Sequence, residues 1–265
     1  MYSEEQDFAE KRHALVEMHA RLERAGISRD FAKANVLEIG GAGGVLAGLL
    51  CADVKRIIVS DIVDHQALYD GQFPQLLKEK FFRNDADFSL QAIEFQVADA
   101  TDLPYRDELF DLVVSFNAFE HIPDPLSALR EAFRVAKWGG VIYLTFDPIW
   151  TADTGNHFSS IVREPWRHLL CSEDDFCKEM SIGGATEDQI SDFRFGLNRR
   201  QACMYRDEFP ALLSSLGVTR VHCENWSGCV LDSNVDHPNR FNAARLLGCP
   251  PEDLLIRGFT YCITK

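Results

Sequence analysis

The sequence predicts an α/β fold in which a mostly parallel, doubly wound sheet of seven strands has helices on both faces. Three observations predict it. Short apolar segments alternate with amphipathic ones, a glycine-rich turn follows the first apolar segment, and the fourth apolar segment lacks the alternation of a strand with one wet face. The 265 residues, 46% of them hydrophobic, suffice for one large domain with a sizeable core.

The first half of the chain contains the repeating units. Residues 4–25 predict an amphipathic helix with Phe8, Leu15, Met18 and Leu22 on one stripe. Strands are expected at residues 35–39, 56–60, 93–97, 112–115 and 141–146, and a small-residue helix at 45–50. Such alternation of strands and helices is typical of parallel strands joined by helical crossovers.

A well-marked helix precedes the fifth strand. Asp124 is a suitable N-cap, and Pro125 suits the first turn. Lys137 and the pair Gly139-Gly140 predict the end of this helix.

The regular pattern ends after Asp147. Residues 148–205 are rich in aromatic, histidine and charged residues and have weak periodicity, so we interpret them as an insertion rather than a separate domain. The rest of the chain predicts a helix at 206–216, strands at 218–223 and 258–264, and a second irregular excursion at 232–256.

Charge and composition argue against several partners. With 27 basic and 41 acidic residues the net charge is −14, which repels phosphate backbones, so nucleic acid is not expected as a partner. The sequence contains no run of about 18 apolar residues, so no membrane span is expected. The acidic N-terminus does not resemble a signal peptide. The eight cysteines are scattered without a Cys-x-x-Cys pair, which favours free thiols and a cytoplasmic location. A local basic patch could override the average charge: Arg194, Arg199, Arg200 and Arg206.

Three signals follow the ends of predicted strands, where open α/β sheets bind ligands. The first is Glu38 followed by the turn Gly40-Gly41-Ala42-Gly43-Gly44, where the backbone can approach a ligand closely. The second is Asp61, about 20 residues further on, which suits two ribose hydroxyls. The third is Ala98-Asp99-Ala100, where a carboxylate beside a backbone amide can recognise an adenine edge.

The order of these segments resembles the class I S-adenosylmethionine-dependent methyltransferase family, in its type 11, ubiquinone-biosynthesis-like branch. The similarity spans residues 36–146 and includes the stretch 99–115, the segment Ala118-Phe119-Glu120-His121-Ile122-Pro123-Asp124-Pro125 and the turn Lys137-Trp138-Gly139-Gly140. It implies a Rossmann-like sheet with an antiparallel last strand. We expect a single domain over 1–265, composed of a helical lid (1–30), a cofactor-binding core (31–147), a substrate-side insertion (148–205) and a C-terminal part (206–265).

The resemblance implies S-adenosylmethionine as cofactor and S-adenosylhomocysteine as product. Ala42 departs from the family, which usually has a glycine there, and adds mild crowding. The residues that the resemblance assigns to the cofactor are Glu38 (ammonium group), Gly40 and Gly41 (methionine part), Asp61 (ribose hydroxyls), Ile62, Asp99 and Ala100 (adenine), and Phe116 and Asn117 (sulfonium).

The acceptor is expected to be a hydroxyl. The fourth strand ends in Ser115-Phe116-Asn117-Ala118, which lacks the Asn/Asp-Pro-Pro-aromatic element of enzymes that methylate amino groups of nucleobases. A hydroxyl needs a base, and His121 and His157 are the catalytic candidates. Transfer to nitrogen or carbon of a small metabolite is the alternative.

A divalent metal ion is a second, less favoured hypothesis. The segment Asn117-Ala118-Phe119-Glu120-His121 resembles the Glu-x-x-Glu-His metal motif of some quinone-precursor and small-RNA O-methyltransferases. It would make Glu120, His121 and His157 metal ligands that polarise the hydroxyl. Asn117 stands where that motif has its first Glu.

Three further segments, at 146–150, 165–170 and 253–259, look similar to methyltransferases of bacterial surface-polysaccharide clusters. This resemblance makes a sugar hydroxyl the preferred acceptor, so the expected partner is a small molecule or glycan. A homodimer is left open.

Two other classes fit part of the pattern. A nicotinamide-dependent oxidoreductase would share the glycine turn and Asp61 but does not explain Asp99-Ala100. A non-catalytic binding protein could keep the cofactor fold, and turnover on any acceptor would exclude it.

Overall fold

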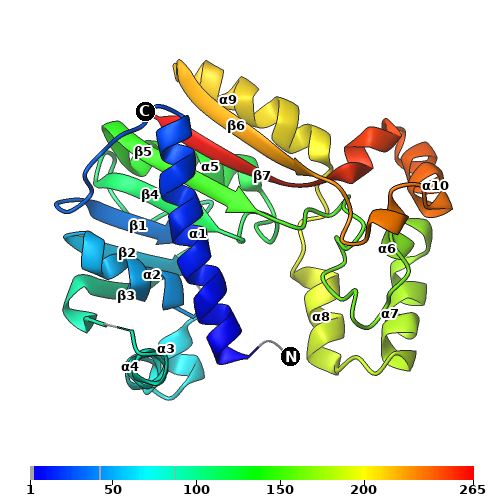
Figure 1. Cartoon of the computed structure of the whole chain (residues 1–265), viewed down its shortest axis with the longest axis horizontal. Coiled ribbons are helices and arrows are strands. Elements are labelled where there is room, and N and C mark those ends of the chain that lie inside the picture. The colour runs from blue at the N-terminus through cyan, green and yellow to red at the C-terminus, as the bar shows by residue number, and fades with distance from the viewer. Residues whose placement is uncertain (1–2, 42, 87) are drawn as a thin grey trace.

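The computed structural model describes residues 3–41, 43–86 and 88–265. Its centre is a seven-stranded sheet in the order β3-β2-β1-β4-β5-β7-β6 (Figure 1). β7 is antiparallel to both of its neighbours, and the pairs formed by the first five strands are parallel. The predicted α/β fold with an antiparallel last strand is therefore confirmed. The strands are β1 (Asn35–Ile39), β2 (Arg56–Asp61), β3 (Ile93–Val97), β4 (Phe110–Phe116), β5 (Ala136–Phe146), β6 (Arg220–Ser227) and β7 (Ile256–Thr264).

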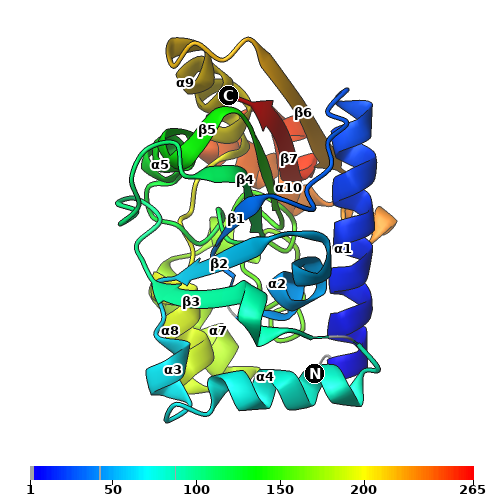
Figure 2. The ribbon, with the colours of Figure 1, turned by 90° about the vertical axis from the view of Figure 1, so that its left-hand side faces the viewer.

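Helices cover both faces of this sheet. Figure 2 shows α1 and α2 on one face and α5 and α9 on the other. Because side chains alternate along a strand, Leu112 and Val114 pack under α1 and α2, whereas Val113 belongs to the core under α5 and α9. The α-helices are α1 (Glu4–Arg24), α2 (Val45–Leu50), α3 (His65–Leu68), α4 (Phe73–Arg83), α5 (Pro125–Val135), α6 (Arg167–Leu170), α7 (Glu173–Ile182), α8 (Glu187–Phe195), α9 (Phe209–Ser215) and α10 (Pro238–Leu247).

The predicted first helix is present as α1 and is anchored at both ends. Ser3 and Gln6 form a capping box at its start. Near this end the Phe8 ring packs edge-to-face against Phe81 of α4, with ring centroids 4.9 Å apart. At the other end Arg24 pairs with Glu224 of β6 at 3.3 Å. α1 thus crosses the whole face of the sheet, and its movement as a lid stays a prediction.

The C-terminal half is more helical than the sequence predicted. The prediction that residues 232–256 are irregular is wrong, because they contain α10. Within 148–205 the structure has α6, α7 and α8, which the weak periodicity did not show. These helices are short and bury few residues: His168 of α6, Phe176, Cys177 and Met180 of α7, and Phe193 of α8. So few buried positions give little periodic signal.

Two other boundaries differ. β5 begins at Ala136, so the pair Gly139-Gly140 lies inside a strand and not after a helix. The helix predicted at 206–216 begins with a π-helical turn, Met204–Glu208, that leads into α9. The sequence analysis also left α3 and α4 unassigned.

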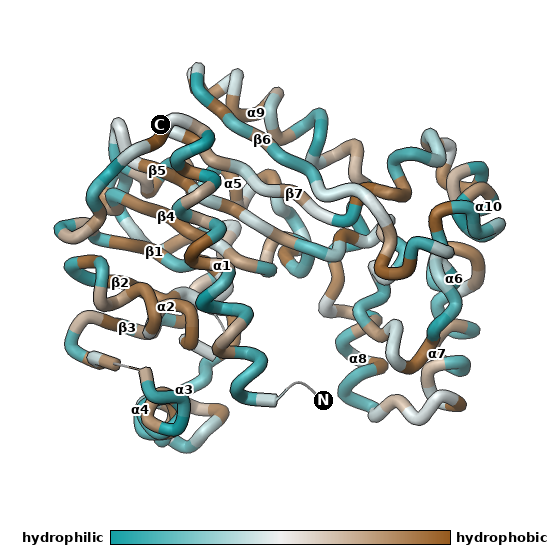
Figure 3. The backbone as a smooth tube through the Cα atoms, in the orientation of Figure 1, coloured by the Kyte–Doolittle hydropathy of each residue, from teal (hydrophilic) through white to brown (hydrophobic). Residues whose placement is uncertain are grey.

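The two inserted segments pack together beside the sheet (Figure 1). Trp166, before α6, is buried with Ala243 and Ala244 of α10 in a separate apolar cluster. Figure 3 shows the hydrophobic residues concentrated in the central strands, whereas the helices are two-sided. Over the described residues, no helix has the length and hydropathy of a membrane span.

Candidate active site

The ends of β1, β2 and β4 and the segment after β3 surround a cavity of about 460 Å³, the first cavity. Six residues that the sequence assigned to the cofactor line it. They come from four separate strand ends, as expected of a parallel sheet. The six are Gly40, Asp61, Ile62, Asp99, Ala100 and Asn117, and His121 lines the same cavity.

A second cavity, of about 240 Å³, continues from the first around the glycine turn. The two cavities share Gly40 and Asn117. The remaining residues assigned to the cofactor line the second cavity, so all nine line two cavities that adjoin at shared residues and together are called the cleft. Its lining includes Asp7, Lys11, Glu38, Gly40, Gly41, Lys80, Phe116 and Asn117.

The glycine turn leaves no space for side chains at two positions. Gly40 has φ of +71°, and a Cβ there would overlap the Cβ of Ala118. A Cβ on Gly41 would overlap Val59 and come within 2.9 Å of the Glu38 carboxyl carbon. Ala42, the departure from the family, lies outside the described residues.

Glu38 lies at the floor of the second cavity with an incompletely satisfied carboxyl group. Its side chain is buried, the residue being 3% exposed, and Oε2 has no hydrogen-bond partner among the described residues. Burial raises the pKa of Glu38 from 4.5 to about 8, although Lys11 opposes this shift. A buried carboxyl group without a partner is suited to a cationic ligand group, which would favour the ionised form.

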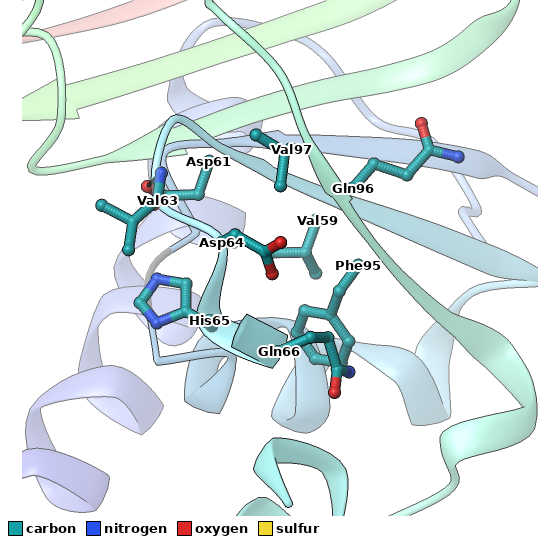
Figure 4. A pocket seen from close by; sticks show the side chains of 9 residues that line it. All are labelled: Val59, Asp61, Val63, Asp64, His65, Gln66, Phe95, Gln96 and Val97. Atoms are coloured by element: carbon teal, nitrogen blue, oxygen red, sulfur yellow. Dashed lines mark hydrogen bonds between the residues drawn. The ribbon is translucent and has the colours of Figure 1, made fainter. Parts of the chain in front are cut away.

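The two aspartates at the first cavity are held by backbone groups. The Val63 amide donates to Asp61 Oδ1 at 2.9 Å, and the Thr101 amide donates to Asp99 Oδ1 at 2.8 Å. Asp61 also borders a small pocket of about 30 Å³ between β2 and β3 (Figure 4). Ile62 is 69% exposed, so its apolar side chain is available to cover a flat ligand.

Asn117 is the residue that joins the cavities. It follows β4 with φ of +50°, a conformation that asparagine tolerates better than most residues. Its amide donates to the Thr145 carbonyl at 2.7 Å, which fixes the turn against the end of β5. Together with Phe116, Asn117 also lines a third cavity of about 220 Å³.

The third cavity lies between α1 and the ends of β4, β5 and β6, and sequence analysis missed it. Tyr143, Thr145 and Asp147 are spaced by two along and beyond β5, so they share the face under α1. That run of polar groups ending an apolar strand was the one local signal. The cavity is lined by Glu10, Lys11, His13, Ala14, Glu17, Arg21, Phe116, Asn117, Tyr143, Thr145, Asp147 and Trp226.

The two histidines proposed as bases lie away from the third cavity. His121 lines the first cavity, and its Nδ1 is 2.6 Å from the Gly196 carbonyl. His157 lines none of the three cavities, and its Nε2 lies 2.9 Å from the Pro148 carbonyl. Burial and the nearby His121 lower the pKa of His157 to about 4, so its ring is neutral at pH 7. A direct catalytic role for either histidine stays a prediction.

The three suggested metal ligands lie near one another without forming a metal site. The rings of His121 and His157 are 5.0 Å apart, and His121 Nε2 is 3.9 Å from Glu120 Oε1. Burial raises the pKa of Glu120 well above its ordinary value, which favours a neutral carboxyl group. Across 3–41, 43–86 and 88–265, no three His, Cys, Asp or Glu side chains are grouped to hold a metal ion. The geometry gives the metal hypothesis no support.

Comparison with known proteins adds the family. Residues 37–144 match the family model described as "Methyltransferase domain". This part of the chain is therefore similar to a methyltransferase domain. Its glycine turn, Asp61, Asp99 and Asn117 all fall within the matched range.

Curated relatives match at low identity. Tocopherol O-methyltransferase from Arabidopsis thaliana is 29% identical over 189 residues, which are 71% of this chain and 44% of the relative. Ubiquinone biosynthesis O-methyltransferase from Xanthomonas oryzae pv. oryzae is 26% identical over 130 residues, 47% of this chain and 48% of the relative. The chain thus spans less than half the length of these relatives.

A solved structure agrees in fold. Phosphoethanolamine N-methyltransferase 2 from Haemonchus contortus, in complex with S-adenosylhomocysteine, superposes with a TM-score of 0.51 at 13% identity. The match covers 94% of this chain and 52% of the other. At this identity the likeness concerns the methyltransferase fold alone.

Proposed function

We propose that this protein is an S-adenosylmethionine-dependent methyltransferase that methylates a hydroxyl group of a small molecule. The observation that carries the proposal is the meeting of the first and second cavities at Gly40 and Asn117. The first has carboxylates suited to a ribose and an adenine, and the second has a buried carboxyl group suited to an ammonium group.

Each end of the cofactor would have its own partners. Asp61 would accept hydrogen bonds from the ribose hydroxyls, while Asp99 and Ala100 would bind the adenine edge. Glu38 would pair with the ammonium group, and the glycine backbone would pass beside the methionine part. When bound, the cofactor supplies a methyl group activated by a positively charged sulfur.

The acceptor is proposed from the relatives and the sequence. Two relatives are named as O-methyltransferases, of tocopherol and of ubiquinone biosynthesis, and another is named ajmaline N-methyltransferase. We therefore favour an oxygen acceptor, with a sugar hydroxyl as the candidate from the sequence. Action as a homodimer in the cytoplasm is also a proposal, and gel filtration and cell fractionation would test it.

Titration calorimetry tests the cofactor directly. S-adenosylmethionine and S-adenosylhomocysteine should bind with micromolar affinity, NAD should not, and treatment with a chelator should change nothing. Asp61→Ala should weaken this binding about 100-fold, and Asp99→Ala should also weaken it. A folded protein that binds neither compound would contradict the enzyme and support a non-catalytic role for the fold.

A further inference from the structure

The third cavity opens where the reacting group would lie. The first and second cavities meet at Gly40 and Asn117, so a cofactor spanning both would have its sulfur near this junction. The third cavity shares Asn117 with both and Phe116 and Lys11 with the second. A molecule in the third cavity can therefore approach the methyl group while the cofactor remains in place.

The inner wall of the third cavity is aromatic. Tyr143 of β5 and Phe116 of β4 pack with ring centroids 5.4 Å apart, and Trp226 of β6 also lines the cavity. Trp226 Nε1 is buried and has no hydrogen-bond partner among the described residues. Phe116 and Trp226 are partly exposed, whereas Tyr143 is 1% exposed and lies behind Phe116. The Arg21 guanidinium lies 4.9 Å from the centroid of the Trp226 ring. A wall of these aromatic rings suits a flat ring.

Asp147 is the acid of this cavity that follows a strand end, whereas Glu10 and Glu17 lie on α1. It follows β5 two residues after Thr145, whose carbonyl binds the Asn117 amide. Of the other acids, Glu17 lies on α1 within 3.5 Å of Arg21 Nε, and Glu10 is exposed. Asp147 has a side chain that is 24% exposed, and its nearest ionic partner is Arg257 at 3.8 Å.

The surroundings of Asp147 increase its affinity for a proton. Burial raises the pKa of its carboxyl group; Arg257 of β7 and Arg21 of α1 oppose this shift, and Glu10 of α1 adds to it. Asp147 also interacts electrostatically with Glu120, after β4. A base whose pKa lies closer to neutral pH takes a proton more effectively than an ordinary carboxylate does.

We propose that the third cavity binds the acceptor as an aromatic hydroxyl compound, in place of the sugar hydroxyl that the sequence suggested, and that Asp147 is its general base. The inference rests on the proposed methyltransferase function. The acceptor oxygen forms a bond to the methyl carbon as the carbon–sulfur bond breaks, and the bonding pair stays on sulfur. The hydroxyl proton passes to the Asp147 carboxylate, so a sulfonium and a carboxylate become a thioether and a carboxylic acid.

The first test compares Asp147→Asn with the wild type on 4-substituted phenols from 4-methylphenol to 4-nitrophenol. Loss of the base should lower kcat about 100-fold or more for the least acidic phenol. The loss should shrink below about tenfold for 4-nitrophenol, which ionises without help. Asp188→Asn, on the exposed surface of α8, is the matched control and should match the wild type.

The second test needs no turnover. In the S-adenosylhomocysteine complex at pH 8, the wild type should bind 4-nitrophenol in its protonated form, because ionised Asp147 accepts the O–H and repels the phenolate. The phenolate absorbance near 400 nm should therefore fall on binding, as general phenol chemistry requires. In Asp147→Asn the fall should be lost, because the repulsion is gone while Lys11 and Arg21 remain.

The outcomes separate this inference from the function on which it rests. Failure of the wild type to bind S-adenosylhomocysteine would contradict the methyltransferase itself. Binding of S-adenosylhomocysteine without methylation of any phenol would overturn the aromatic acceptor. An equal loss of rate across the phenol series, or none, in an Asp147→Asn protein of unchanged Tm and S-adenosylhomocysteine affinity would overturn the base.

Discussion

The first and third cavities adjoin the same turn after β4 but are assembled differently. The first is built from short segments that directly follow strands, between Ile39 and Pro123. The third draws on residues as far apart as Glu10 and Trp226. The first cavity has fixed carboxylates at the strand ends. The third combines charged side chains of α1, and Asp147 after β5, with aromatic rings on three strands.

This difference separates two tasks. The first cavity recognises a ligand by backbone-held groups, such as Asp61 and Asp99, which neighbouring amides orient. The third uses long side chains of α1, including Lys11 and Arg21, whose positions depend on how the helix is packed. We therefore expect changes in the first cavity to affect cofactor binding, and changes in the third to affect the acceptor.

The largest expected effect is that of Asp61→Ala. Loss of two charge-assisted hydrogen bonds to the ribose should cost about 3 kcal/mol, or about 100-fold in S-adenosylhomocysteine affinity. Titration calorimetry would measure it, with Asp188→Ala on α8 as the control. An affinity within threefold of the wild type would show that Asp61 does not bind the ribose. It would contradict the assignment of the first cavity to the cofactor.

Glu38→Gln should weaken cofactor binding and increase stability at high pH. The pKa of Glu38 is raised to about 8 in the folded protein, so its neutral form favours folding at low pH. That contribution is complete below pH 4.5 and is lost as pH rises through 8. At pH 9 the Gln variant should exceed the wild type in unfolding free energy by on the order of 3 kcal/mol.

Urea denaturation at pH 6 and pH 9 would measure this difference, and calorimetry should show about 30-fold weaker cofactor binding. The exposed Glu187→Gln on α8 is the control. Equal stability gains at both pH values would show that Glu38 is already ionised at pH 6.

Asn117→Val tests the turn after β4 that all three cavities share, and its expected effect is of intermediate size. A β-branched residue at φ of +50° should destabilise the protein by about 1–2 kcal/mol, and it should impair both the cofactor and the acceptor. Asn117→Gly accepts this φ and should keep most of the stability. Thermal unfolding of the two variants would distinguish them, and equal losses would point to the side chain rather than the backbone.

The smallest effect is expected from the histidines. His157→Ala should change kcat less than about fivefold, because the ring binds the Pro148 carbonyl away from the third cavity. His121→Ala should act on cofactor affinity instead, by a similarly small factor, because it lines the first cavity. Steady-state kinetics on the phenol series would measure both, and a 100-fold fall for His157→Ala would restore it as the base.

The sequence predicts the first cavity well because its signals are local. Glu38 and the glycines lie within seven residues, and Asp61 and Asp99 each follow a recognisable apolar strand. Since parallel strands end at one edge of a sheet, spacing along the chain was enough to gather these residues.

The third cavity could not be predicted in the same way. Arg21 and Trp226 are brought together by the docking of α1 on β6, and no local spacing links them. The predicted range of β5, residues 141–146, was too short because Gly139 and Gly140 resemble the end of a helix. The insertion helices were missed because their few buried residues form a separate cluster, around Phe176 and Phe193.

The most direct test of the central claim is a crystal structure of the protein with S-adenosylhomocysteine. The account predicts adenine beside Asp99, the ribose hydroxyls on Asp61, the amino group on Glu38 and the sulfur beside Asn117, facing the third cavity. Electron density for the ligand outside the cleft, or a sulfur turned away from the third cavity, would contradict it.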